Sequence, residues 1–368
     1  MVSAAWYRPL RWLRRYFLLV LGLLFAIRFW SRGFWSDHRI SLGEFSVARL
    51  SASGSVPGHF ARHFCRQHGW TVFRPTAKDG RRKVYDLSMI NNELDWLEIR
   101  LNTTYDHVDY FVLVEGTKTF TGLDKPLAIK GNWDRFVPYQ SKIIYHQLEY
   151  PDNFDPQRTW DREDLQRDAT FQQVFPKLKG AQKPNYGDVL VVADVDEIPR
   201  PETLVVLRTC DFPRRLTLRS RFHYYSFQFL HRGEEWRHPQ ATYYQGSRTI
   251  LPVNLRNGDG APQPLVYWEK GDLWNAAWHC SSCYETIEGF LRKLSSFSHV
   301  WMNQDQYRNR DRIAHRVRNG KDLWDREGEV YDRVDNNTDV PRYLLDHADR
   351  FQYLLDRDGE SAGFIDYP

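Results

Sequence analysis

The chain has little net charge and no repetition. Its 368 residues carry a formal net charge of +4, and six arginines without a single acidic residue fall within residues 1–36. The rest of the chain therefore carries a formal net charge of −2 and lacks the basic footprint of a nucleic-acid-binding protein. No internal repeat or low-complexity tract is present. About 300 residues follow the N-terminal region, which is enough for one large domain with a substantial core.

Cysteine is scarce, and the four that are present limit the redox chemistry. In an oxidising compartment they allow up to two disulfides with three possible pairings. A pair of cysteines separated by two residues could also be half of a zinc site, but no second ligand pair with suitable spacing follows it. We therefore expect disulfides rather than zinc. The four residues are Cys65, Cys210, Cys280 and Cys283.

A long apolar run is also missing. The apolar stretch at residues 16–27 has twelve residues, whereas a membrane-spanning helix needs about 20. Tryptophans extend its apolar character on both sides, and four arginines precede it, which places the N-terminus in the cytosol. We interpret residues 1–35 as a cytosolic tail and an uncleaved signal-anchor helix. A cleaved signal peptide is the alternative, although no small-residue cleavage site follows Ile27.

The remaining sequence divides into a short stem and a large domain. Residues 36–59 are rich in serine and glycine and read as a stem, and residues 60–368 read as a lumenal domain. Apolar strand candidates alternate with helical segments such as residues 164–175, which predicts an α/β fold with a mostly parallel sheet covered on both faces. The strand candidates are residues 84–87, 110–115, 142–145 and 189–194.

The most informative stretch is residues 189–199, where an apolar run ends in three carboxylates. Side chains alternate along a strand, so Asp194 and Asp196 should share one face with Val195 opposite. Paired carboxylates at a strand's carboxyl end repel each other unless a cation lies between them. Such oxygen ligands suit Mn²⁺ or Mg²⁺, with a phosphate-bearing substrate completing the shell. The alternatives are a plain strand-end turn or a Ca²⁺ loop.

Four blocks of sequence follow one another in order along the chain. They are residues 84–127, residues 160–167 with 194–199, residues 278–283 and residues 341–355. Together they resemble glycosyltransferase family 17. The resemblance implies a Golgi type II membrane protein with a glycosyltransferase A-type fold, a mixed, mostly parallel sheet with flanking helices. It also implies inverting transfer of N-acetylglucosamine from UDP-GlcNAc to a mannose hydroxyl of an N-glycan, as in bisecting β-1,4 transfer.

Further residues are candidates for the donor site. His279 could meet the metal, since Mn²⁺ accepts imidazole, or it could be an ordinary core histidine. Arg167 could bind phosphate through its planar fork, or it could be a solvated helix charge. Glu197 could bind the metal, contact the donor sugar or cap the segment that follows it. Asp86 and Glu115 lie where a strand end could meet the uridine or its ribose.

An inverting transfer needs a general base that deprotonates the acceptor hydroxyl. Asp272, Glu285 and Glu288 surround the block at residues 278–283, and Glu288 is the preferred candidate, with Asp272 second; each could equally be a surface carboxylate. Two other functions remain open. One is a different Golgi transferase, such as a mannosyltransferase; the other is a non-catalytic lumenal glycan-binding protein. The expected partners are a UDP-sugar donor, an N-glycan or glycoprotein acceptor and, through the anchor, a membrane.

Overall fold

The computed structural model describes residues 16–24, 26, 58–75 and 81–367. The chain separates into two units, residues 1–38 and residues 39–368. In the first unit, residues 16–24 are helical. Among the described residues, no helix is both long and apolar enough to cross a membrane. The rest of the predicted anchor, and the predicted stem up to residue 57, lie outside the described residues.

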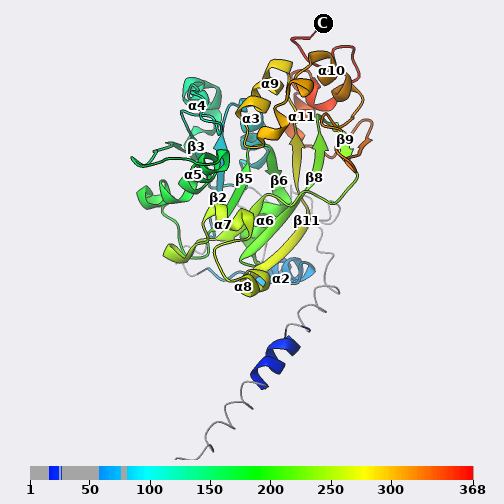
Figure 1. Ribbon diagram of the computed structural model, residues 1–368. Helices are drawn as coiled ribbons and strands as arrows, with labels where there is room; N and C mark the ends of the chain where they lie inside the picture. Colours follow the sequence, from blue (N-terminus) through cyan, green and yellow to red (C-terminus); the bar gives the residue numbers. More distant parts are fainter. Residues whose placement is uncertain (1–15, 25, 27–57, 76–80, 368) are drawn as a thin grey trace, which may run out of the picture. The chain divides into compact units, whose positions relative to one another are not determined.

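The sheet of the second unit begins with four parallel strands (Figure 1). Their order across the sheet is β5-β2-β3-β4, and every neighbouring pair among them runs parallel. All four were predicted from apolar runs. Their bounds are β2 Val84–Ile90, β3 Tyr110–Glu115, β4 Ile143–Gln147 and β5 Val189–Asp194.

The second half of the sheet differs from the prediction of a mostly parallel sheet. Strand β10 pairs antiparallel with both β5 and β8, and β9 pairs antiparallel with β8 and β12. Within the described residues the sheet has ten strands and is mixed. Short connections such as the one at Tyr225 between β8 and β9 allow only antiparallel neighbours. The bounds are β6 Glu197–Pro199, β8 Arg215–Tyr224, β9 Ser226–His231, β10 Gln240–Tyr243, β11 Lys270–Ser281 and β12 Tyr331–Arg333.

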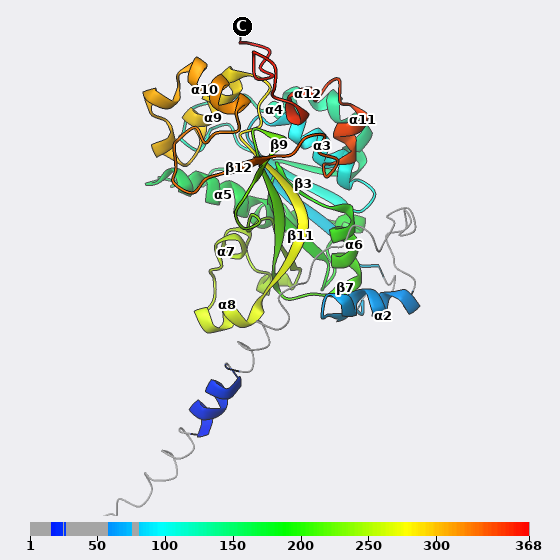
Figure 2. The same cartoon turned by 90° about the vertical axis from the view of Figure 1, so that its right-hand side faces the viewer.

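Helices cover both faces of the sheet because successive strand residues point to opposite sides. Val191 packs into a cluster with residues of α3 and α6, whereas the next residue, Val192, packs into a cluster with residues of α5 and α7. The two pairs of helices lie on opposite sides of the sheet in Figure 2. Their bounds are α3 Leu94–Thr104, α5 Thr159–Gln172, α6 Pro201–Thr209 and α7 Pro252–Asn257.

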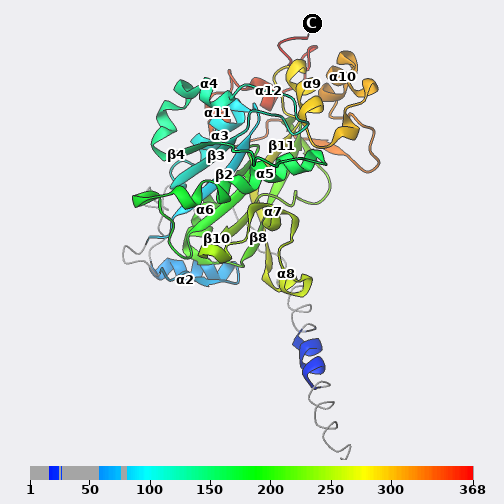
Figure 3. The ribbon, with the colours of Figure 1, turned by 60° about the vertical axis from the view of Figure 1, so that its left-hand side comes forward.

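A third apolar cluster lies beyond the ends of β8 and β9. It joins Tyr224 and Tyr225 to Phe290 of α9 and Ile313 of α10, and Figure 3 shows α9 and α10 close together at that end of the domain. The remaining elements border the sheet. They are α2 Gly58–Gln67, α4 Ala128–Gly131, α8 Gln263–Glu269, α9 Ile287–Ser296, α10 Arg310–Arg318, α11 Arg342–Asp346, α12 Gln352–Leu355, and the paired short strands β1 Thr71–Val72 and β7 Cys210–Asp211.

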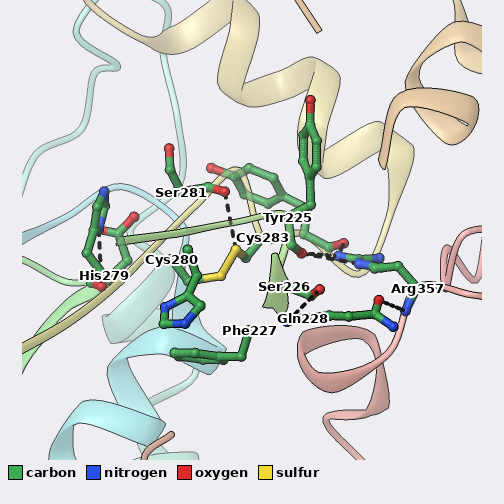
Figure 4. Close-up of a disulfide and its surroundings, with 12 residues drawn as sticks. Tyr225, Ser226, Phe227, Gln228, His279, Cys280, Ser281, Cys283 and Arg357 are labelled. Carbon is green, nitrogen blue, oxygen red and sulfur yellow. Dashed lines mark hydrogen bonds and ion pairs between the residues drawn. A yellow bond between two sulfur atoms is a disulfide. The ribbon is translucent and has the colours of Figure 1, made fainter. Parts of the chain in front are cut away.

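All four cysteines form disulfides, which confirms the expectation of disulfides rather than zinc. Cys65 of α2 pairs with Cys210 of β7, 145 residues later. Cys280, the penultimate residue of β11, forms a disulfide with Cys283 three residues further on. Figure 4 shows this bond together with His279. One bond thus ties α2 to the domain, and the other closes a small loop.

Removing the two disulfides should have unequal effects on stability. Because a cross-link stabilises more when it closes a longer loop, we expect the Cys65→Ser, Cys210→Ser protein to lose about 5 kcal/mol of unfolding free energy, and the Cys280→Ser, Cys283→Ser protein about 2 kcal/mol. Urea unfolding of both double variants measures this. Equal losses, or a larger loss for the short loop, would contradict it.

Candidate active site

The carboxylates singled out in the sequence surround a tight turn after β5. Strand β5 ends at Asp194, residues 195–196 form the turn and β6 begins at Glu197. Val195 is buried in the core, whereas the side chains of Asp194 and Asp196 keep 31% and 23% of their surface exposed. The two aspartates therefore lie at the carboxyl end of a central strand, where ligands of α/β sheets bind.

A buried arginine from α3 holds this turn in place. Arg100 donates to the main-chain carbonyls of Asp194 at 3.2 Å and Glu197 at 2.7 Å. Its other nitrogens donate to both oxygens of Asp86, at 2.6 and 2.7 Å. Asp86 lies inside β2 and is buried. Its carboxylate therefore orients Arg100 and does not face the space around the turn.

A chain of alternating charges fixes Asp194 and Glu197. Arg167 of α5 donates to Glu163 at 2.7 Å and to one oxygen of Asp194 at 2.8 Å. Arg256 of α7 donates to the other oxygen of Asp194 at 2.7 Å and to both oxygens of Glu197, at 2.8 and 2.9 Å. Both oxygens of Asp194 are thus occupied by guanidinium groups. Two-point contacts of this kind fix geometry as well as charge.

These arginines determine the ionisation of the pair that they bind. Burial favours the neutral form of Asp194, but the positive charges of Arg167 and Arg256 outweigh burial and lower its pKa below the ordinary value. Burial likewise opposes ionisation of Glu197, and Arg256 nonetheless holds its pKa well below the ordinary value. Both groups are therefore carboxylates at neutral pH, and their charges are already compensated.

Asp196 is different, because no guanidinium of the described residues pairs with it. Within that part of the chain, the ion-pair partner of its carboxylate is the imidazole of His279, whose Nδ1 lies 3.8 Å from Oδ1. Burial raises the pKa of Asp196 to about 6, and the fields of His279 and Lys293 only partly oppose that effect. Asp196 is thus a half-compensated carboxylate that would gain from an added cation.

Aromatic rings hold His279 in position. The imidazole stacks on the ring of Phe222, with centroids 5.1 Å apart, and on that of Trp236 at 5.4 Å. Trp236 also donates its indole N–H to Glu197 at 2.9 Å. His279 lies opposite Glu197 in the β11–β6 pairing. The sheet register therefore brings the histidine to the turn from 83 residues further along the chain.

Comparison with known proteins identifies the family. The model of glycosyltransferase family 17 matches residues 54–360. The chain belongs to glycosyltransferase family 17. It is 28% identical over 313 residues to the human β-1,4-mannosyl-glycoprotein 4-β-N-acetylglucosaminyltransferase, and 28% identical over 320 residues to the rat protein of that name. Each match covers 78% of this chain and 57% of the relative, so the chain spans a little over half the length of these relatives.

In this member of family 17 the structure gathers five of the predicted site residues and leaves four apart. Those brought together at the turn are Asp194, Asp196, Glu197, Arg167 and His279. Asp86 is turned to Arg100, as described above. Glu115 is fully buried and accepts hydrogen bonds from the Ile129 main chain and the Tyr145 hydroxyl, both at 3.1 Å.

The two candidates for the general base lie away from the turn. Asp272 pairs with Arg219 at 2.7 Å. It lies opposite Thr217 of β8 and His279 lies opposite Phe222, five positions further on, a separation of about 17 Å at the usual strand rise. Glu288 is exposed in the first turn of α9. It lies about 140° around that helix from Lys293, the α9 residue whose charge reaches Asp196. Neither carboxylate joins the cluster at the turn.

Sequence reasoning missed Arg256, Arg100, Trp236 and Lys293. Arg256 meets Asp194 across 62 residues of sequence, and no local pattern marks such a contact. Glu163 did carry a signal, because it precedes Arg167 by four residues on one helix, the spacing at which opposite charges pair.

The residues at the turn offer a divalent cation an incomplete set of ligands. Within the described residues, no group of three or more histidine, cysteine, aspartate or glutamate side chains is arranged to hold a metal. Asp194 is occupied by two arginines, whereas Asp196 and His279 offer an oxygen and a nitrogen ligand. Mn²⁺ and Mg²⁺ often take one or two protein ligands and complete their shell with substrate phosphates. The donor set fits that arrangement.

The raised pKa of Asp196 predicts a pH-dependent difference in stability between the wild-type protein and its Asp196→Asn variant. The pKa is about 6 in the folded protein and 3.8 as its ordinary value. Between about pH 4 and pH 6 the folded state therefore binds more protons than the unfolded state, and the stability of the wild type falls as pH rises through that window. We expect the variant to gain about 2–3 kcal/mol over wild type between pH 4 and pH 7. Thermal unfolding of both proteins at the two pH values checks this. A difference independent of pH would contradict it.

Proposed function

We propose that this chain is an inverting N-acetylglucosaminyltransferase that uses UDP-GlcNAc as donor and a mannose hydroxyl of an N-glycan as acceptor. Family membership makes it a glycosyltransferase. The relatives with 28% identity bear the name of an N-acetylglucosaminyltransferase, which supports this donor and acceptor. The observation that carries the proposal is the half-compensated carboxylate of Asp196 beside His279 at the carboxyl end of the central strand.

We assign different tasks to the two aspartates. Asp196 and His279 would hold Mn²⁺ or Mg²⁺ together with the donor diphosphate. The metal supplies positive charge that neutralises the diphosphate as the bond to the sugar breaks. Asp194 would contribute a fixed negative charge and a rigid turn, since both of its oxygens accept from arginines. Arg167, whose guanidinium is shared between Glu163 and Asp194, would position Asp194 rather than bind phosphate.

Lys293 would add a cation whose charge acts on Asp196. Its ammonium nitrogen lies 3.6 Å from Glu93. Burial disfavours its charge, but Tyr284, Glu93 and Asp196 outweigh burial and raise its pKa, so it remains protonated. A permanent cation beside the proposed metal ligand would help to stabilise negative charge on the leaving diphosphate.

The proposal does not extend to Glu288 or Asp272 as general base. Asp272 pairs with Arg219, and Glu288 is exposed to solvent on α9. Neither carboxylate is therefore placed to hydrogen-bond a group at the turn. The proposal does include a glycosyltransferase A-type sheet and a Golgi location with residues 1–35 as a type II anchor. The two disulfides fit a secretory compartment.

A donor screen tests the proposed function. The full chain would be incubated with a biantennary N-glycan, Mn²⁺, and either UDP-GlcNAc or GDP-mannose. The masses of the products would then be measured by mass spectrometry. We expect addition of one N-acetylhexosamine from UDP-GlcNAc and no reaction with GDP-mannose. Transfer from GDP-mannose would favour a mannosyltransferase, and glycan binding without any transfer would favour a non-catalytic protein.

A further inference from the structure

Aromatic side chains gather beside the carboxylate turn. The indole of Trp160, at the start of α5, is 38% exposed and meets the ring of His299 edge-on, with centroids 5.0 Å apart. His299 in turn stacks on Phe297, with centroids 4.9 Å apart and ring planes at 18°. We call these three residues the aromatic strip.

One end of the strip is tied to the helix that holds Asp194. Trp160 precedes Glu163 by three residues and Arg167 by seven, so all three side chains project from one face of α5. Trp160 then lies about 10 Å along the helix from Arg167. The segment that carries the strip is bound to the same helix, because Ser298 donates to Glu163 at 2.7 Å and Thr159 donates to the Ser298 carbonyl at 3.0 Å.

The other end of the strip reaches the side of the turn that carries Asp196. The ammonium nitrogen of Lys293 lies 4.3 Å from the ring centroid of Phe297. The charge of Lys293 acts on Asp196. Hydrogen bonds therefore connect Asp194 to the strip through Arg167, Glu163 and Ser298. The charge of Lys293 couples the other end of the strip to Asp196 electrostatically.

Packing does not account for the exposure of Trp160. Within the described part of the chain, three apolar clusters make up the core, and Trp160 belongs to none of them. Trp301, 46% exposed, and Val300, 56% exposed, follow in the same segment. Exposed apolar groups beside a polar site are typical of a binding surface.

We propose that the aromatic strip is an acceptor subsite, in which a hexose ring of the glycan stacks on Trp160. The C–H groups of a pyranose face are weakly positive, and the face of an indole is negative. Charged groups at the edge of the strip, such as Lys293 and Glu93, can hydrogen-bond hydroxyl groups. The chemical class of the ligand rests on the proposed function, whereas the location of the subsite rests on these contacts.

The test compares two exposed tryptophans of the full chain. Trp160→Ala removes the stacking surface, Trp160→Phe keeps an aromatic ring, and Trp268→Ala is the matched control, since Trp268 on α8 is 36% exposed. We expect Trp160→Ala to raise KM for a biantennary N-glycan about tenfold, the effect of losing one aromatic stacking contact. KM for UDP-GlcNAc and the melting temperature should be unchanged. Trp160→Phe should restore most of the acceptor affinity, and Trp268→Ala should behave like wild type.

An unchanged acceptor KM in an active Trp160→Ala enzyme would overturn the subsite, as would an equal rise in the KM of donor and acceptor. Direct titration of the same N-glycan into wild type and Trp160→Ala separates this inference from the proposed function. Loss of glycan binding in the variant supports the subsite even if wild type transfers no sugar. Equal binding by both proteins overturns it.

Discussion

Replacing Asp196 by asparagine should reduce sugar transfer by about 10²-fold or more and at the same time stabilise the protein at neutral pH. The amide keeps the shape of the side chain but cannot neutralise a cation, and loss of one electrostatic contact to the transition state has effects of this size. Stability should rise because Asp196 is the carboxylate of the turn whose neighbouring charges do not outweigh burial, so its pKa is raised to about 6. Functional groups commonly reduce stability in this way.

Transfer rates with UDP-GlcNAc and thermal melting at pH 7.5, measured on the same preparations, check this prediction. Asp335→Asn provides a matched control, because the Asp335 side chain is 69% exposed and pairs with Arg333 on the surface. The control should change neither quantity appreciably. An Asp196→Asn enzyme with near-normal turnover would remove Asp196 from the donor site, and a destabilised variant would contradict the account of its ionisation.

Replacing Arg256 by methionine should cost about 3–5 kcal/mol of unfolding free energy. The substitution leaves Glu197, which is 1% exposed, without its cation, and leaves Asp194 with only one of its two. Removing one partner of a buried ion pair costs this much because the other charge stays buried and uncompensated. Arg256→Lys should recover only part of the loss, since one ammonium cannot contact both carboxylates as the planar guanidinium does.

Urea unfolding measures this loss, and an exposed ion pair provides the comparison. Arg333 donates to Asp358 on the surface, with 44% and 47% of the two side chains exposed, so Arg333→Met should cost less than about 1 kcal/mol. Adding Glu197→Gln to Arg256→Met should return part of the stability without restoring transfer. A loss below about 1 kcal/mol for Arg256→Met would show that the arginine does not stabilise the fold by compensating the buried carboxylates.

The first half of the fold could be predicted from sequence because its signals are local. Residues 110–115 and 189–194 are apolar runs of strand length, and both are strands with those bounds. The second half could not be predicted in the same way. Strand β10 has four residues and lies between β5 and β8. No pattern within four residues specifies which strands will flank it, since pairing is decided by contacts far apart in sequence.

The candidate site was predictable to a similar extent. The three carboxylates at the end of β5 and just after it can be recognised in the sequence because they end an apolar run. His279 is brought to them by the register of β11 and β6. Asp86 and Glu115 were chosen for their position on strands, but position does not reveal that a buried partner satisfies each one. Asp194 and Asp196 looked equivalent in sequence. They differ because two arginines from separate helices reach only Asp194.

Titration of UDP into the full chain tests the central claim, that the turn after β5 holds the donor diphosphate through Asp196. Calorimetry would be run with Mn²⁺, with EDTA, and with the Asp196→Asn variant. The account predicts binding by wild type in Mn²⁺ and affinity at least about tenfold weaker both in EDTA and in the variant, a loss of 1.4 kcal/mol or more. Equal affinity for UDP in wild type and Asp196→Asn would contradict it.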